Sequence, residues 1–388
     1  MTTKYDELKR QSLFIRSSPD FYKTDWIADS STGLSVASNN ATYVTLLKNP
    51  DSGTSYYITR QADSSSTFVC FRYSFNHQAL NSVLVISETV NFKLNVTTSE
   101  FGARLIPMVA SSITLGGRES KVIVTDYAFG ASSKLQYSTA QIFYGGVIAN
   151  RDVLFLHGDS SQEYEFAMRF TGTPNKFQAD HSPLVQFTTA NAKSDGMVWI
   201  HLLPGIEQLV NIYDSDTMLV LYADSETAAT FWSPAIAGKS DDPFKNFWSI
   251  GTNESILVGG PYLVREAKIT DTTLALRGDL KTDVRLSVIA STHIRAITWN
   301  GESVTGDLTA SLSLSAFGGF VAQLQTSSSF GGVRIPKLSG WKFKDSLPEV
   351  ENTYDDSNWT VANHTSTNIP LKPYYGDGSI LYGCDYGL

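Results

Sequence analysis

Aromatic and acidic side chains that could hold a sugar are concentrated near the C-terminus. Trp359 is followed by the stretch YYGDGS, which contains Tyr374, Tyr375 and Asp377. A sugar site needs an aromatic face for the C–H groups of the ring and polar side chains that bond its hydroxyls. These four residues therefore form a candidate carbohydrate-binding site. The alternative is that Trp359 fills a core and YYGDG is an ordinary turn.

Close pairs of carboxylates could instead act as a general acid and base. The acids in question are Glu163, Glu165, Asp214, Asp216, Asp241 and Asp242. Spacings such as EYE and DSD place carboxylates on one face of a strand or in a loop, which is usually a solvated surface. We therefore interpret these acids as surface side chains and predict no catalytic residue among them.

Motifs for other chemistries are missing from the sequence. It has no nucleophile elbow, no GxGxxG pattern and no P-loop. Its six histidines are scattered and it has no CxxC pair, so no metal site is expected. The sequence predicts no cofactor.

Five Asn-X-Ser/Thr sequons are candidate N-glycosylation sites, and they favour a secretory ancestry. Their asparagines are Asn40, Asn95, Asn253, Asn358 and Asn363. The N-terminus MTTKYDELKR is charged at once and has no apolar segment, so no signal peptide is predicted. The chain is then either a segment whose first methionine is artificial or a cytoplasmic product, and the sequence leaves both open.

Composition and charge restrict the class of protein. The 388 residues suggest two or three domains, and 42% of them are hydrophobic, which is enough to build cores. The net charge of −8 argues against nucleic acid as a partner, because phosphate binding needs a basic surface. No apolar run approaches the length of a membrane span, so no membrane association is expected.

Short apolar runs separated by turn residues recur from about residue 40 onward. Examples are TYVTLL, SYYITR, KVIVTDY, DVLFLHG and TMLVLYA. NPDSG, between the first two runs, and Asn300-Gly301, farther along, are hairpin signals. The pattern predicts an all-β fold of antiparallel β-sandwich domains, with Greek-key or jelly-roll-like parts and one or two short helices.

Two helices are predicted within this β-rich chain. The first covers residues 4–16 and ends before Pro19. The second covers 225–236, with Ser225 or Thr227 as its N-cap.

Four segments are predicted from these elements and from the change in composition after residue 336. Residues 1–30 form a helical or extended entry segment, 31–245 a first large antiparallel β domain, and 246–336 a small β-sandwich. Residues 337–388 are rich in turn residues and too few to build a core of their own. We expect this last segment to pack on the second sandwich.

Several stretches, in order along the chain, resemble one family. The two longest are WSIGTNESILVGGPYLVREA (248–267) and WKFKDSLPEVENTYDDSNW (341–359), and YDELKRQSLFIRSSPDFYKTDW, TLGGRESKVIVTDYAFG and LQYSTAQIF are others. All are similar to the large fungal β-galactosidases of glycoside hydrolase family 35. There, such stretches lie in the all-β accessory domains that follow the catalytic barrel. The resemblance identifies 31–245 with domain 2, 246–336 with domain 3, and 337–388 with part of a jelly roll.

The resemblance also implies a function. Family 35 enzymes use two glutamates about 5 Å apart, as retaining glycosidases do; both lie in the barrel, and no matching motif occurs in this chain. The expectation is therefore a non-catalytic, lectin-like protein that binds glycans containing galactose. Two alternatives are a purely structural fragment and the accessory half of a two-chain glycosidase. A homo-oligomer is also expected, because shallow sugar sites bind weakly and several copies would increase avidity.

Overall fold

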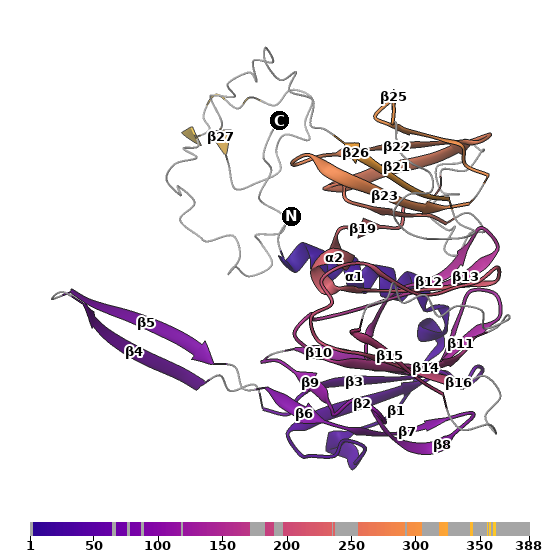
Figure 1. The fold of residues 1–388 in the computed structure, drawn as a ribbon. Coiled ribbons are helices and arrows are strands. Elements are labelled where there is room, and N and C mark those ends of the chain that lie inside the picture. The colour runs from indigo at the N-terminus through magenta and orange to yellow at the C-terminus, as the bar shows by residue number, and fades with distance from the viewer. Residues whose placement is uncertain are drawn as a thin grey trace. The chain divides into compact units, whose positions relative to one another are not determined.

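The computed structural model divides the chain into two compact units, Met1–Thr326 and Ser327–Leu388. The residues it describes are 3–63, 67–75, 78–86, 89–117, 119–170, 183–189, 197–234, 236, 255–291, 293–304, 318–324, 342–343, 355, 357 and 360–361. In the second unit, β27 (Lys342–Phe343) pairs antiparallel with β28 (Thr360–Val361). Everything below concerns the first unit unless stated otherwise (Figure 1).

An eight-stranded antiparallel sheet forms the centre of the first sandwich. In sheet order its strands are β1 (Asp25–Asp29), β2 (Thr42–Lys48), β3 (Ser55–Gln61), β10 (Ser120–Phe129), β11 (Ser133–Ser138), β14 (Tyr164–Arg169), β16 (Met197–Leu202) and β15 (Val185–Thr189). The NPDSG signal is confirmed between β2 and β3. Asn49 Oδ1 accepts from the backbone amides of Asp51 and Ser52, and Gly53 takes a positive φ of 79°.

Both faces of this sheet are covered. One face packs against a four-stranded sheet of β12 (Gln141–Ile148), β13 (Arg151–Gly158), β18 (Met218–Asp224) and β17 (Val210–Asp214), around buried Tyr127, Phe166, Leu154 and Tyr222. The other face packs against two small ribbons (Figure 1), around residues such as Tyr57, Leu94 and Ile106. The ribbons are β6 (Val90–Phe92) with β9 (Ile113–Leu115), and β7 (Leu94–Thr98) with β8 (Gly102–Ile106). A further hairpin joins β4 (Thr67–Phe75) to β5 (Gln78–Ile86).

Helix α1 (Thr3–Ser17) confirms the first predicted helix. It ends where the 3-10 helix η1 (Pro19–Lys23) begins, and its Leu13 packs with Phe143 and Phe155 on the outer face of the four-stranded sheet. Three cations of α1 also donate to carbonyl oxygens in residues 225–233: Lys9 to Ala229, Arg10 to Ser225 and Arg16 to Ser233. The Lys9 ammonium lies 4.1 Å from the centre of the Trp232 ring.

The second predicted helix is shorter than expected. Helix α2 covers only Ser225–Ala229, and its N-cap is Asp224, whose carboxylate accepts from the amide of Thr227 at 2.8 Å. Ser225 and Thr227 were therefore wrong as N-caps. The helix stops because Phe231 and Trp232 form strand β19 (Phe231–Trp232) and pair with β20 (Leu257–Gly259), which buries the Phe231 ring. No helix in the described residues is long and apolar enough to cross a membrane.

The second sandwich packs two four-stranded sheets around its own core of Val258, Leu276, Val288 and Trp299. The sheets are β19, β20, β23 (Val284–Ala290) and β26 (Gly318–Leu324), and β21 (Leu263–Thr270), β22 (Thr273–Asp279), β24 (Ala296–Trp299) and β25 (Glu302–Ser303). Asn300-Gly301 makes the β24–β25 hairpin, as predicted, and both residues have positive φ. Gly260, in the stretch 248–267, lies close to the backbone of Arg285. A Cβ there would lie 2.1 Å from the carbonyl oxygen of Arg285.

The all-β fold is confirmed, but two strand pairs are parallel where an antiparallel system was expected. They are β13 with β18 and β22 with β24. Between β13 and β18 the chain crosses to the eight-stranded sheet and back, and between β22 and β24 it forms β23 in the facing sheet. A strand that returns after such a crossing can run in the same direction as its neighbour.

Candidate functional site

Most of the predicted site residues lie outside the described residues. These are Trp359, Tyr374, Tyr375 and Asp377 of the candidate sugar site, and the sequon asparagines Asn253, Asn358 and Asn363. The C-terminal sugar site therefore stays a prediction. The other two sequon asparagines, Asn40 and Asn95, are both exposed.

Glu165 is not a surface carboxylate, as the EYE spacing led us to expect. It is fully buried, and its carboxylate accepts from three successive backbone amides: Met108 at 2.6 Å, Val109 at 2.5 Å and Ala110 at 2.7 Å. The phenol of Tyr137 also donates to it. A carboxylate with four donors and no exposure cannot meet a substrate. It fixes the loop 107–111.

Glu163, which directly precedes β14, anchors the same loop. It accepts from both the backbone amide and the hydroxyl of Ser111, and its other oxygen lies 2.8 Å from His201 Nε2. Burial alone would raise the pKa of Glu163, but the hydrogen bonds from Ser111 and His201 outweigh it and lower the pKa. Glu163 therefore stays ionised and structural.

Asp214 is a second exception to the surface interpretation. Its carboxylate pairs with Arg151, and the two side chains are 1% and 4% exposed. Burial and pairing make this an internal ion pair, since a buried charge needs a partner. Asp216 is exposed, as predicted, whereas Asp241 and Asp242 lie outside the described residues.

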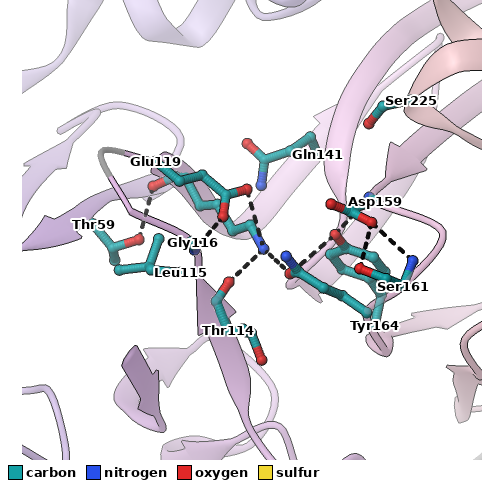
Figure 2. Close-up of polar contacts among 12 residues, drawn as sticks. Thr59, Thr114, Leu115, Gly116, Glu119, Gln141, Asp159, Ser161, Tyr164 and Ser225 are labelled. Carbon is teal, nitrogen blue, oxygen red and sulfur yellow. Dashed lines mark hydrogen bonds and ion pairs between the residues drawn. The ribbon is translucent and has the colours of Figure 1, made fainter. Parts of the chain in front are cut away.

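A buried lysine, Lys121, is part of another polar cluster (Figure 2). Lys121 Nζ lies 2.6 Å from the carbonyl oxygen of Thr114 and 3.4 Å from Glu119 Oε1, and it donates to the side chain of Gln162. Burial lowers its pKa, and the Glu119 carboxylate opposes that shift. Because three acceptors occupy its ammonium, we assign Lys121 a structural role in holding β10 against the turn that precedes β14.

One histidine–serine contact has the composition of a base and a nucleophile. His157 Nδ1 lies 3.1 Å from Ser225 Oγ. However, His157 is buried, and burial together with the nearby Arg10 lowers its pKa to about 3. An imidazole this weakly basic cannot take the serine proton near neutral pH. The described residues contain no cluster of three or more metal-ligating side chains either.

Among the described residues, a partly open cavity of about 320 Å³ lies beside α1. It is lined by α1, η1, the end of β10, residues 144–147 of β12, and Ser233 and Ser255. This volume is within the range of about 300–1,000 Å³ that is typical of small-molecule sites. The cavity therefore has room for a small organic ligand.

The polar groups of this cavity suit a neutral, hydroxylated molecule. Arg16 Nη1 donates to the carbonyl oxygen of Ser233, and a guanidinium group has five N–H donors in all. Asp20 accepts from Thr54 Oγ1 at 2.9 Å through Oδ2, while Oδ1 makes no hydrogen bond with the described residues. Burial raises the pKa of Tyr144 to about 12, so its phenol stays neutral; it hydrogen-bonds with Ser255 and donates to the carbonyl oxygen of Val147 over a long 3.4 Å. Donors, acceptors and an aromatic ring thus meet in one place.

Sequence reasoning missed this cavity. The residues that form it come from five separate segments, and none belongs to a recognisable motif. The available signal was the pair Gly145-Gly146 after Tyr144: a Cβ on Gly145 would lie 2.7 Å from the Tyr127 hydroxyl, and one on Gly146 would lie 2.7 Å from the Tyr144 hydroxyl. Consecutive glycines inside a strand indicate a close approach of this kind.

Comparisons with known proteins agree with the fold. The family model described as "Beta-galactosidase, domain 2" matches residues 27–231, and "Beta-galactosidase, domain 3" matches residues 232–315. Similar proteins include "Probable beta-galactosidase B" of Emericella nidulans, 33% identical over 400 residues, and the proteins of the same name from Aspergillus terreus, 33% over 390, and Penicillium rubens, 31% over 398.

These alignments cover all of this chain but only 33–34% of each relative, so the chain spans about a third of the length of the curated relatives it matches. The domain 2 model alone matches more than half of the chain. The chain belongs to the β-galactosidase family, and its residues 27–315 match all-β accessory domains of that family.

Proposed function

We propose that the chain is a non-catalytic carbohydrate-binding unit that recognises galactose-containing glycans. The observation that supports this best is the cavity beside α1, in which Arg16, Asp20 and Tyr144 present the donors and acceptors that sugar hydroxyls require. The relatives are named β-galactosidases, and galactose is therefore the first sugar to test.

The lack of catalysis is part of the proposal. A retaining glycosidase needs two carboxyl groups about 5 Å apart that both reach the substrate. In this chain Glu165 is buried under four donors and Asp214 is paired with Arg151, so neither can do so. We expect purified protein to hydrolyse no chromogenic β-galactoside.

Binding is expected to be weak. A small cavity with few polar groups gives dissociation constants on the order of millimolar, or roughly −4 kcal/mol. Calorimetry with galactose and glucose, at millimolar sugar, measures it directly. Tyr144→Phe and Asp20→Asn each remove one hydrogen-bonding function, worth about 1 kcal/mol, and should weaken binding about five-fold. Tyr22→Phe and Asp51→Asn, outside the cavity, are the matched controls.

The C-terminal residues offer a second place for the same function. If the cavity variants bind normally but Trp359→Ala and Asp377→Ala do not, the glycan site lies in the second unit. If no variant changes the affinity, both assignments are wrong. If the wild-type chain binds no sugar at all, the carbohydrate-binding proposal fails.

A structural role is the competing candidate. The chain matches only a third of each relative, and the exposed apolar residues Leu8, Trp26 and Ile27 would suit a surface that another part of a longer protein covers. The accessory half of a two-chain glycosidase is a variant of this role. Absence of sugar binding together with self-association in sedimentation experiments would favour it.

A further inference from the structure

We propose that Asn95 carries an N-linked glycan whose first sugars cover an apolar patch beside it. We use the term for Leu105, which is 50% exposed and lies opposite Asn95, together with Met108 and Val109, which follow it closely in the chain and are 45% and 43% exposed. This inference does not depend on whether the chain binds sugars.

Asn95 is presented outward by an ordered strand. Along β7 the side chains alternate, with Leu94, Val96 and Thr98 buried and Asn95 and Thr97 exposed. The asparagine and the threonine of the sequon Asn-Val-Thr therefore lie on the same open face. The carboxamide of Asn95 makes no hydrogen bond with the described residues, whereas its backbone amide donates to the carbonyl oxygen of Val36 at 2.8 Å.

Leu105 lies directly opposite this asparagine. In the antiparallel pair of β7 and β8, Asn95 faces Leu105 and Thr97 faces Ala103. Directly opposed residues have side chains on the same face, with Cβ atoms about 4.5–5.5 Å apart. A sugar joined to Asn95 must therefore begin within contact distance of the Leu105 side chain.

The apolar patch cannot turn inward to escape water. The backbone of these residues is fixed. The amides of Met108 and Val109 donate to Glu165, and Lys93 Nζ donates to the carbonyl oxygen of Pro107 at 3.1 Å. The interior under this ribbon is already filled, since Leu94 and Ile106 are fully buried. The C–H face of a sugar can cover Leu105 without changing the fold.

The attachment is a balanced group transfer that needs a secretory oligosaccharyltransferase and a lipid-linked pyrophosphate oligosaccharide. A bond forms between Asn95 Nδ2 and C1 of the first N-acetylglucosamine. The bond between C1 and the pyrophosphate oxygen breaks, the lipid pyrophosphate leaves, and the amide nitrogen loses one proton. No oxidant or reductant is needed.

Occupancy is the first test. The whole chain is secreted from a yeast host, and its peptides are treated with peptide N-glycosidase in ¹⁸O-labelled water, which converts a glycosylated asparagine to labelled aspartate. We expect the label at residue 95 in most molecules of the wild type. An unlabelled Asn95 peptide in folded, secreted protein would overturn the proposal.

Coverage is the second test, and it uses an apolar fluorescent dye. Asn95→Gln should bind at least twice as much dye as the glycosylated wild type, and Leu105→Ser added to that variant should reverse most of the increase. Asn40→Gln, which removes an exposed sequon from a turn, is the matched control and should change nothing. Equal dye binding by the wild type and Asn95→Gln would show that the glycan does not cover the patch.

Discussion

The buried histidine on β13 should make the first sandwich sensitive to acid. His157 is 7% exposed and packs edge-on against the Phe143 ring. Arg10 and Lys121 would repel a positive charge on its imidazole, and Glu7 offsets this repulsion only in part. Burial is the largest cause that lowers its pKa, from 6.5 to about 3. The folded chain thus keeps this imidazole neutral, whereas the unfolded chain protonates it below about pH 6.5.

The sign and size of the effect follow from proton linkage. Between pH 6.5 and about 3 the unfolded state binds more protons, so the free energy of unfolding falls as the pH falls through this window. One pKa unit is worth about 1.4 kcal/mol. From about pH 7.5 to about pH 4.5, His157 alone should therefore remove about 3 kcal/mol of stability.

Urea unfolding followed by tryptophan fluorescence at these two pH values measures the loss. His157→Gln cannot titrate, so the variant should lose about 3 kcal/mol less than the wild type on acidification, whatever its stability at neutral pH. His293→Gln, which removes an exposed histidine, is the control for the substitution. Equal losses in the wild type and His157→Gln would show that the histidine titrates normally in the fold and would refute the reasoning.

Three further substitutions test single features by the same urea assay. Gly260→Ala should cost more than about 2 kcal/mol, because its Cβ would collide with a backbone carbonyl at a φ of 106°; Gly301→Ala, where φ is 93° and the space is open, should cost about 1. Replacing Glu165 by Leu leaves three backbone amides, including that of buried Ala110, and the buried Tyr137 hydroxyl without their acceptor, and we expect a loss above about 3 kcal/mol, against almost none for Asp216→Leu. For Asp224→Ala, loss of the N-cap should cost about 1 kcal/mol, and an unchanged stability would mean that α2 needs no cap.

Local signals in the sequence predicted the parts of the fold that depend on neighbours in the chain. Asn300-Gly301 favours positive φ at both residues, which is a property of the dipeptide itself. Alternation along β7 or β22 likewise reports which side chains are buried. For the same reason, the all-β class and both hairpins could be predicted.

Features that depend on distant segments could not be predicted in this way. The residues EYE do not indicate that the loop 107–111 supplies three amides to Glu165. The residues SETAATFW do not indicate that Phe231 pairs with a strand that ends at Gly259. The cavity beside α1 has the same origin, because Arg16 and Tyr144 meet only after the helix docks on β12. Pairing partners decide these features, and a single sequence does not show them.

The contacts of α1 with residues 225–233 also determine how early α1 can complete its packing during synthesis. Lys9 and its acceptor Ala229 are 220 residues apart in the chain. A ribosome that adds about 5–20 residues per second needs roughly 10 to 45 seconds to cover that distance. During this interval the apolar side of α1, including Leu13, lacks the apolar neighbours that β18 and α2 add to the same core. Helix α1 is therefore made well before the residues that complete its packing, so a chaperone that binds α1 in the nascent chain would protect its apolar side until residues 225–233 emerge.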